Sequence, residues 1–246
     1  MDSHHRRSIS ALIILLVIVI LYAHERTIAP MSVLTPMVHV PFAGLVPAPI
    51  YQGSTTSHQV IFTFDGGEGN QSADHILSVL DKHHARATFF LTGTWVEHNP
   101  ELVKKIQAAG HDIYNHSYSH PHLPTLTDSE IVQQLARMDE VFISTTGSST
   151  LPFFRPPYGE YDKRVLSAAA RQRYRAVMWT VDAGDWMESG GFTDAETKSR
   201  IYQNIDPGSI ILMHIGDTIT GRILDDVLTE VESRGYSIVP LSQGLI

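Results

Sequence analysis

Short apolar runs alternate with segments of helical pattern along most of this chain. Runs typical of buried strands occupy positions 60–64, 87–91, 111–115, 151–154, 176–181, 209–213 and 236–240. Between the first two runs, Ile76, Leu77 and Leu80 recur at helical spacing. Strands that alternate with helices predict an α/β fold with a mostly parallel sheet, and continuous apolar strands predict that both sheet faces are covered.

Helix boundaries support this interpretation. The sequence Asn99-Pro100-Glu101 provides a cap, a first-turn proline and an acidic residue at the positive end of a helix. Two segments, 127–130 and 193–196, have the spacing of capping boxes, and further helical patterns cover 162–173 and 225–234. About seven strands in a chain of 246 residues favour a distorted (β/α) barrel over an open, doubly wound sheet.

The N-terminus has a different character. Arg6 and Arg7 precede an apolar run from Ile9 to Ala23, which is typical of a secretory signal or a membrane anchor. Because this region lacks the paired small residues of a cleavage site, residues 1–26 are expected to form an uncleaved signal-anchor, with secretion after cleavage as the alternative. Residues 27–57 are rich in proline and predict an extended linker. Residues 58–246 would then form a folded domain outside the cytoplasm.

Composition excludes several classes of protein. The formal net charge of -8 argues against binding to nucleic acid, whose partners usually present a basic face. The absence of cysteine excludes disulfides, thiolate zinc sites and cysteine nucleophiles. No glycine-rich phosphate fingerprint follows the first strand, so a nucleotide cofactor is not expected.

A histidine pair is the first chemical signal. His116 and His120 are four residues apart, and Pro121 makes a helix unlikely there, so His116 is predicted to end a strand and His120 to lie in the next loop. Neutral imidazole is a common ligand of zinc, iron, nickel and copper. A histidine-rich surface loop is the alternative in a chain with 14 histidines.

The positions of the polar residues relative to the predicted strands favour a metal site over a surface loop. Asp65, His116, Arg155, Asp182 and His214 each follow or end a predicted strand. In a parallel barrel these strand ends share one rim, which is where active sites are built. The sequence therefore predicts one site that contains all five side chains.

The residue types at this rim predict metal-assisted hydrolysis of an amide or ester. A metal on the histidine pair would polarise a carbonyl group and activate water, with Asp65 as general base. Arg155 would orient Asp65 through a charge-assisted bond. His214 would protonate the leaving amine, oriented by Asp185 or Asp182.

Five short motifs, in order, carry a family resemblance. They are Thr63-Phe64-Asp65-Gly66-Gly67, His116-Ser117-Tyr118-Ser119-His120, Arg155-Pro156-Pro157-Tyr158-Gly159, Asp182-Ala183-Gly184-Asp185-Trp186 and Leu212-Met213-His214. With them, residues 58–242 resemble the polysaccharide deacetylase family, the NodB homology domain of carbohydrate esterase family 4.

The resemblance implies hydrolysis of N-acetyl groups on peptidoglycan or a chitin-like polymer, with one divalent metal: zinc, or else cobalt, manganese or nickel. It also assigns roles by motif position. Asp65 would be the base, tethered by Arg155, and His214 the acid, supported by Asp185. The metal ligands would be His116 and His120, and the Tyr158 backbone N–H, Trp186 and Leu212 would hold the acetyl group.

One departure from the family pattern affects the metal. The first motif of the family usually has a second aspartate that binds the metal, and here that position is Gly66. Asp65, Glu68, Asn70 or a water could replace this ligand. Two alternatives stay open: a catalytically impaired, membrane-tethered glycan-binding module, and an amide hydrolase that acts on a small molecule.

Overall fold

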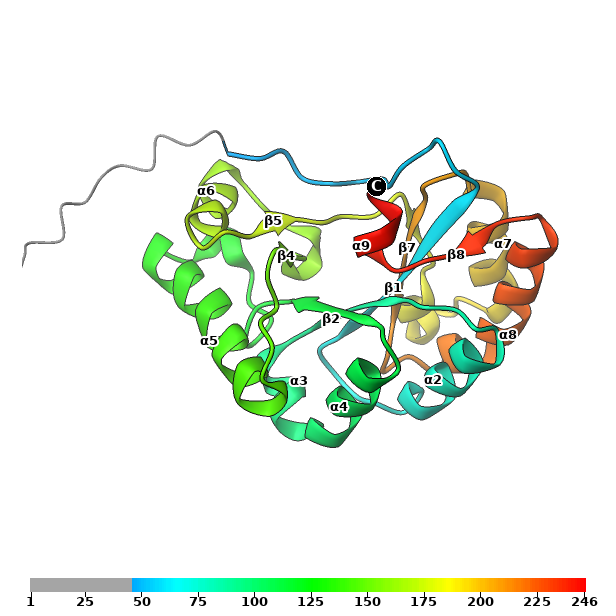
Figure 1. Cartoon of the computed structure of the whole chain (residues 1–246), viewed down its shortest axis with the longest axis horizontal. Helices are drawn as coiled ribbons and strands as arrows, with labels where there is room; N and C mark the ends of the chain where they lie inside the picture. Colours follow the sequence, from blue (N-terminus) through cyan, green and yellow to red (C-terminus); the bar gives the residue numbers. More distant parts are fainter. Residues whose placement is uncertain (1–45) are drawn as a thin grey trace, which may run out of the picture. The chain divides into compact units, whose positions relative to one another are not determined.

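The computed structural model describes residues 46–246 (Figure 1). The predicted signal-anchor and most of the predicted linker lie outside the described residues. Within the described part of the chain, no helix is both long and apolar enough to cross a membrane.

The described chain forms an α/β fold around a curled, half-barrel sheet of parallel strands. The strands are β1 (Gln59–Gly66), β2 (Thr88–Leu91), β3 (Asp112–Asn115), β4 (Phe153–Phe154), β5 (Arg175–Ala176), β6 (Val181–Asp182), β7 (Ile210–His214) and β8 (Ser237–Ile238). Their order is β5-β4-β3-β2-β1-β7-β6, and β8 pairs with β1. The predicted α/β class and parallel sheet are confirmed.

The run 176–181, predicted as one strand, is divided between both edges of the sheet. Its first part belongs to β5, which pairs with β4, and its last residue begins β6, which pairs with β7. Between them, the N–H of Met178 donates to the carbonyl of Ile50 and the N–H of Thr180 donates to the carbonyl of Ile210. Because the backbone changes partners twice, a single ladder cannot form here.

Helices cover the outside of the sheet, where α5, α4, α2 and α8 follow its curve (Figure 1). The helices are α2 (Ala73–Lys82), α3 (Gly93–His98), α4 (Pro100–Ala108), α5 (Asp128–Thr146), α6 (Lys163–Arg171), α7 (Asp194–Asn204), α8 (Thr218–Ser233) and α9 (Leu241–Gly244). Short 3₁₀ helices are η1 (Leu123–Thr125), η2 (Pro157–Gly159) and η3 (Asp185–Gly190). Both predicted capping boxes are present, at the starts of α5 and α7. The sequence did not predict α3, and α8 begins earlier than its apolar pattern indicated.

Alternation along β1 separates the core from the site. Phe62 and Phe64 are fully buried in the cluster that joins the sheet to the outer helices, and each contributes about 1.5–3 kcal/mol by burial. Thr63 and Asp65 alternate with these phenylalanines and project to the other face of the sheet, where both contact Arg155. The parallel register also places Asp65 opposite His214 on β7. A functional carboxylate thus rests on a strand fixed by its apolar neighbours.

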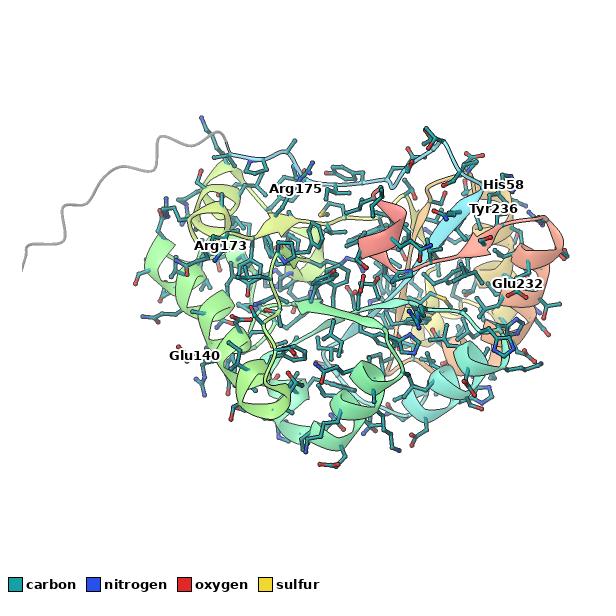
Figure 2. The ribbon with its side chains drawn as sticks, viewed as in Figure 1. His58, Glu140, Arg173, Arg175, Glu232 and Tyr236 are labelled. Atoms are coloured by element: carbon teal, nitrogen blue, oxygen red, sulfur yellow. The ribbon has the colours of Figure 1, made fainter. Side chains whose placement is uncertain are left out.

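The segment before β1 packs on the sheet. Ile50 is buried and pairs with Val177, while the N–H of Gly53 donates to the carbonyl of Gly208. Just before β1, the rings of His58 and Tyr236 are stacked with centroids 4.1 Å apart (Figure 2). Ile50 and Gly53, which fall within the predicted linker, therefore contribute contacts to the folded unit.

Candidate active site

A cleft of about 650 Å³ opens at the carboxyl ends of the strands. Most of the predicted site residues line it: Asp65, His116, His120, Tyr158, Trp186, Leu212 and His214. Arg155 and Asp185 are fully buried and contact the lining residues. The volume suits a small ligand or one end of a larger one.

Arg155 is the buried anchor of the cleft. Its Nη1 donates to Asp65 Oδ1 at 2.6 Å and to Thr63 Oγ1 at 2.9 Å. Its other nitrogens donate to the carbonyls of Val177 and Met178, at 3.3 Å and 3.1 Å. Burial lowers the pKa of Arg155, and the Asp65 carboxylate opposes that shift. The bond to Oδ1 holds the carboxylate in one orientation.

The other oxygen of Asp65 faces the histidine pair. Asp65 Oδ2 lies 3.5 Å from His116 Nε2, which in turn lies 3.2 Å from His120 Nε2. His116 Nδ1 donates to the carbonyl of Arg155 at 2.9 Å, because a carbonyl can only accept. That bond leaves the lone pair of His116 Nε2 directed at the neighbouring ring.

The two imidazoles fit a divalent metal. Ligands held about 2.0–2.1 Å from one zinc ion lie a little over 3 Å apart, which matches the separation of the two Nε2 atoms. Burial lowers the pKa of His116, and burial together with the charge of His116 lowers the pKa of His120 to about 4. Both rings are therefore neutral near pH 7, which is the form that binds metal.

Among the described residues, neither Asp65 nor Glu68 stands in place as a third ligand beside this pair. Two ligands of one zinc ion can be at most about 4.2 Å apart. Asp65, His116 and His120 do not have ligand atoms all within 4.8 Å of one another; among the described residues only Asp185, His214 and Asp217 do. Within that group, the oxygens of Asp185 already accept hydrogen bonds.

The other positions considered for the missing ligand, which are Gly66, Glu68 and Asn70, differ in their surroundings. Asn70 donates to Asn99 and borders a separate, smaller cleft, whereas Glu68 lines the main cleft with the histidine pair. A Cβ at Gly66 would lie 2.7 Å from Leu91 Cδ2 and 2.9 Å from Ile215 Cδ1, in the apolar core.

His214 is paired with the buried Asp185. Its Nδ1 lies 3.0 Å from Asp185 Oδ1, and its backbone N–H donates to Oδ2 at 2.7 Å. Thr220 donates to the same carboxylate, and Asp217 Oδ2 lies 3.6 Å from the imidazole. Burial alone would lower the pKa of His214, but Asp185, Asp65 and Asp217 raise it to about 9. The ring is protonated near pH 7.

The alternative partner, Asp182, has another contact. Its Oδ1 accepts from the N–H of Gly184 at 2.9 Å and from Trp186 Nε1 at 3.3 Å. Asp182 thus orients an exposed tryptophan at the cleft, and Asp185 orients His214.

Of the five non-glycine residues with positive φ in the described chain, three lie at or next to the cleft, and the other two are His84 and Arg173. Ser117, His120 and Tyr158 have φ of 66°, 57° and 59°, values that non-glycine residues rarely adopt. Such strain persists where surrounding contacts enforce it, and it gathers at functional sites.

Several contributors to the site had no role in the sequence-based prediction: Thr63, Trp179, Asp217 and Thr220. Thr63 lies two residues before Asp65 on the same face of β1, so strand alternation could have identified it. Asp217 follows the predicted site residue His214 by three residues, in the loop between β7 and α8, so its spacing could also have identified it. Trp179 and Thr220 come from segments that the tertiary fold brings to the site, and no local pattern marks them.

The protonation of His214 predicts a pH dependence. The pKa in the fold is raised from 6.5 to about 9, so the acid form is complete below about 6.5 and is lost as pH rises through about 9. Asp185→Asn will move this transition to lower pH, because it removes the charge that favours imidazolium. An NMR titration of the His214 ring measures the shift, with Asp182→Asn as the matched control. An equal transition in wild type and Asp185→Asn would contradict the assigned pairing.

Comparison with known proteins places this fold and site in a family. Residues 52–177 match the family described as polysaccharide deacetylase. The chain is 33% identical to the peptidoglycan-N-acetylmuramic acid deacetylase PdaA of Bacillus subtilis, over 76% of this chain and 71% of that protein. The chain belongs to the polysaccharide deacetylase family.

Two further relatives are an uncharacterized protein and a protein described as a pseudoenzyme. An uncharacterized protein of Bacillus subtilis, YlxY, is 37% identical over 84% of this chain, which spans 63% of that protein. The crystal structure of a CE4 family pseudoenzyme from Bacillus anthracis is 34% identical, with a TM-score of 0.76, and the match covers 82% of this chain and 70% of the other. The family thus includes enzymes and a protein described as a pseudoenzyme.

Proposed function

We propose that this chain is a metal-dependent hydrolase that removes N-acetyl groups from peptidoglycan or a related N-acetylated polysaccharide. One observation carries the proposal: a carboxylate held by Arg155 and an imidazolium held by Asp185 share a cleft with two convergent, neutral imidazoles. A base, an acid and metal ligands in one cleft can support metal-assisted hydrolysis of an amide.

Each residue has a defined part in the reaction. Asp65 Oδ2, free of Arg155, accepts the proton of the attacking water, and the C–N bond of the acetamide breaks as His214 donates a proton to the leaving amine. The products are acetate and a free amino sugar. The Tyr158 N–H would stabilise the oxyanion, and Leu212 and Trp186 would enclose the acetyl group. His116 and His120 would hold a divalent ion, preferably zinc, with cobalt, manganese or nickel as alternatives, whose chemistry is to polarise the carbonyl and ease deprotonation of water.

Glu68 is the proposed third protein ligand, and its side chain would have to turn toward the histidine pair to bind the ion. It lines the same cleft as the histidine pair and lies close enough for its charge to favour protonation of His120. Gly66 offers no side chain, and Asn70 is turned toward Asn99. A carboxylate two residues further along the loop would thus replace the aspartate usual in the family.

The proposed location is the outer face of a membrane. Residues 1–26 would anchor the chain, residues 27–57 would serve mainly as a linker, and the domain would act outside the cytoplasm on the polymer. Secretion after cleavage is the alternative.

A glycan-binding module without catalysis is the second candidate. Gly66 and the similarity to a pseudoenzyme favour it. The intact pairing of Asp65 with Arg155 and of His214 with Asp185 favours the enzyme.

Acetate release distinguishes the two candidates. With zinc, cobalt or manganese, we expect acetate from N-acetylglucosamine oligomers or peptidoglycan, and a chelator should abolish it. Zinc titration of the metal-free protein should show affinity lost in His116→Ala and lowered in Glu68→Gln, but unchanged in Glu101→Gln, which alters an exposed residue of α4. Glycan binding without acetate release, in protein shown to hold metal, would refute the enzyme and favour the binding module.

A further inference from the structure

His122 has no role in the proposed reaction, yet it contacts the site. It follows His120 by two residues, and its ring stacks on Tyr158 with centroids 4.1 Å apart and planes 12° apart. Its Nδ1 lies 2.8 Å from Glu160 Oε2. The imidazole is therefore fixed at its edge by a carboxylate and on its face by a phenol ring.

Tyr158 lies between two histidines. One face meets His122, and the ring also makes an edge contact with His120, with centroids 4.5 Å apart and planes at 66°. His120 Nε2 then lies 3.2 Å from His116 Nε2. A continuous row of contacts thus joins Glu160 to the pair of metal ligands.

Tyr158 and His120, in the middle of this row, have conformations that neighbouring contacts must hold in place. Tyr158 and His120 both have positive φ, and the side chain of Tyr158 is 56% exposed. A tyrosine so exposed would ordinarily exchange between rotamers. The contacts with His122 and His120 select one of them, and this also favours one orientation of the Tyr158 backbone within the Arg155-to-Gly159 turn.

One face of the Tyr158 ring is closed to substrate. The face of Tyr158 that is covered by His122 is not available to a pyranose ring. The stack instead continues to His120 through the edge contact with Tyr158, so it can restrict the orientation of that ring.

We propose that His122 is a positioning residue: with Glu160 it holds Tyr158 against His120 and so fixes the orientation of His120. The inference rests on the proposed function where His120 is a metal ligand. The effect on affinity should be moderate, because aromatic pairs change an equilibrium constant by roughly twofold to tenfold.

Cobalt binding to the metal-free protein tests the proposal without using activity. We expect His122→Ala to weaken binding by about threefold to tenfold and to alter the visible spectrum of bound cobalt, since the orientation of His120 changes. His122→Phe, which keeps a flat ring, should recover most of the affinity. His75→Ala, at an exposed histidine of α2, is the matched control and should match wild type.

A second measurement needs no metal. The ring-proton NMR shifts of Tyr158 and His120 should change in His122→Ala and largely return in His122→Phe. Unchanged shifts, or equal cobalt affinity and spectrum in His122→Ala and wild type, would overturn the positioning role. A wild-type protein that binds no cobalt would refute the metal site instead, and the ring shifts would still decide whether His122 holds Tyr158.

Discussion

Asp65→Asn is expected to lower the rate of acetate release by about a hundredfold to ten-thousandfold, the usual contribution of a general base. The amide keeps the size of the carboxylate and a contact for Arg155, but it cannot accept the proton of water. The rate is measured on N-acetylglucosamine oligomers at saturating metal, alongside the thermal midpoint.

Asp182→Asn is the matched control, because that carboxylate also lines the cleft but orients Trp186. It should leave the rate within a few-fold of wild type. If Asp65→Asn retained a tenth or more of the wild-type rate, another group would have to be the base.

Arg155→Met is expected to lower the free energy of unfolding by about 3–5 kcal/mol, the cost of removing one partner of a buried ion pair. The side chain of Arg155 is fully buried, and that of Asp65 is 6% exposed, so the carboxylate would remain without its partner. Three further acceptors, Thr63 and the carbonyls of Val177 and Met178, would also lose a donor.

Urea unfolding of Arg155→Met measures this loss. Adding Asp65→Leu should recover part of it, because the unpaired charge is then gone. Lys104→Met, which breaks an exposed pair with Glu101, should change stability little. A stability equal to wild type in Arg155→Met would show that the pair does not organise the cleft.

Local patterns predicted much of this fold. The capping boxes of α5 and α7, and the apolar runs of β1 and β7, depend on neighbours in the sequence, so they could be recognised without tertiary information. The division of 176–181 could not, because its hydrogen-bond partners include Ile50 and Ile210, from distant parts of the chain.

The candidate site could likewise be predicted only where local patterns determine it. Strand ends predicted that Asp65, His116 and His214 would meet, since parallel strands bring those ends to one rim. The choice between Asp182 and Asp185 depended on the turn at Gly184, which has φ of 77° and directs the two carboxylates to different partners. No local pattern predicts the contact of His122 with Tyr158, because it joins two separate loops.

The surroundings of Gly66 also constrain how the site could evolve. An aspartate gained there by mutation would begin its side chain against Leu91 and Ile215, so both residues would have to shift before the carboxylate could reach the cleft. At Gly67, a Cβ would instead lie at an ordinary contact distance of 3.7 Å from His120. A return to the aspartate usual in the family would therefore require the ends of these two flexible side chains to move, whereas a new carboxylate at 67 would meet only ordinary contacts.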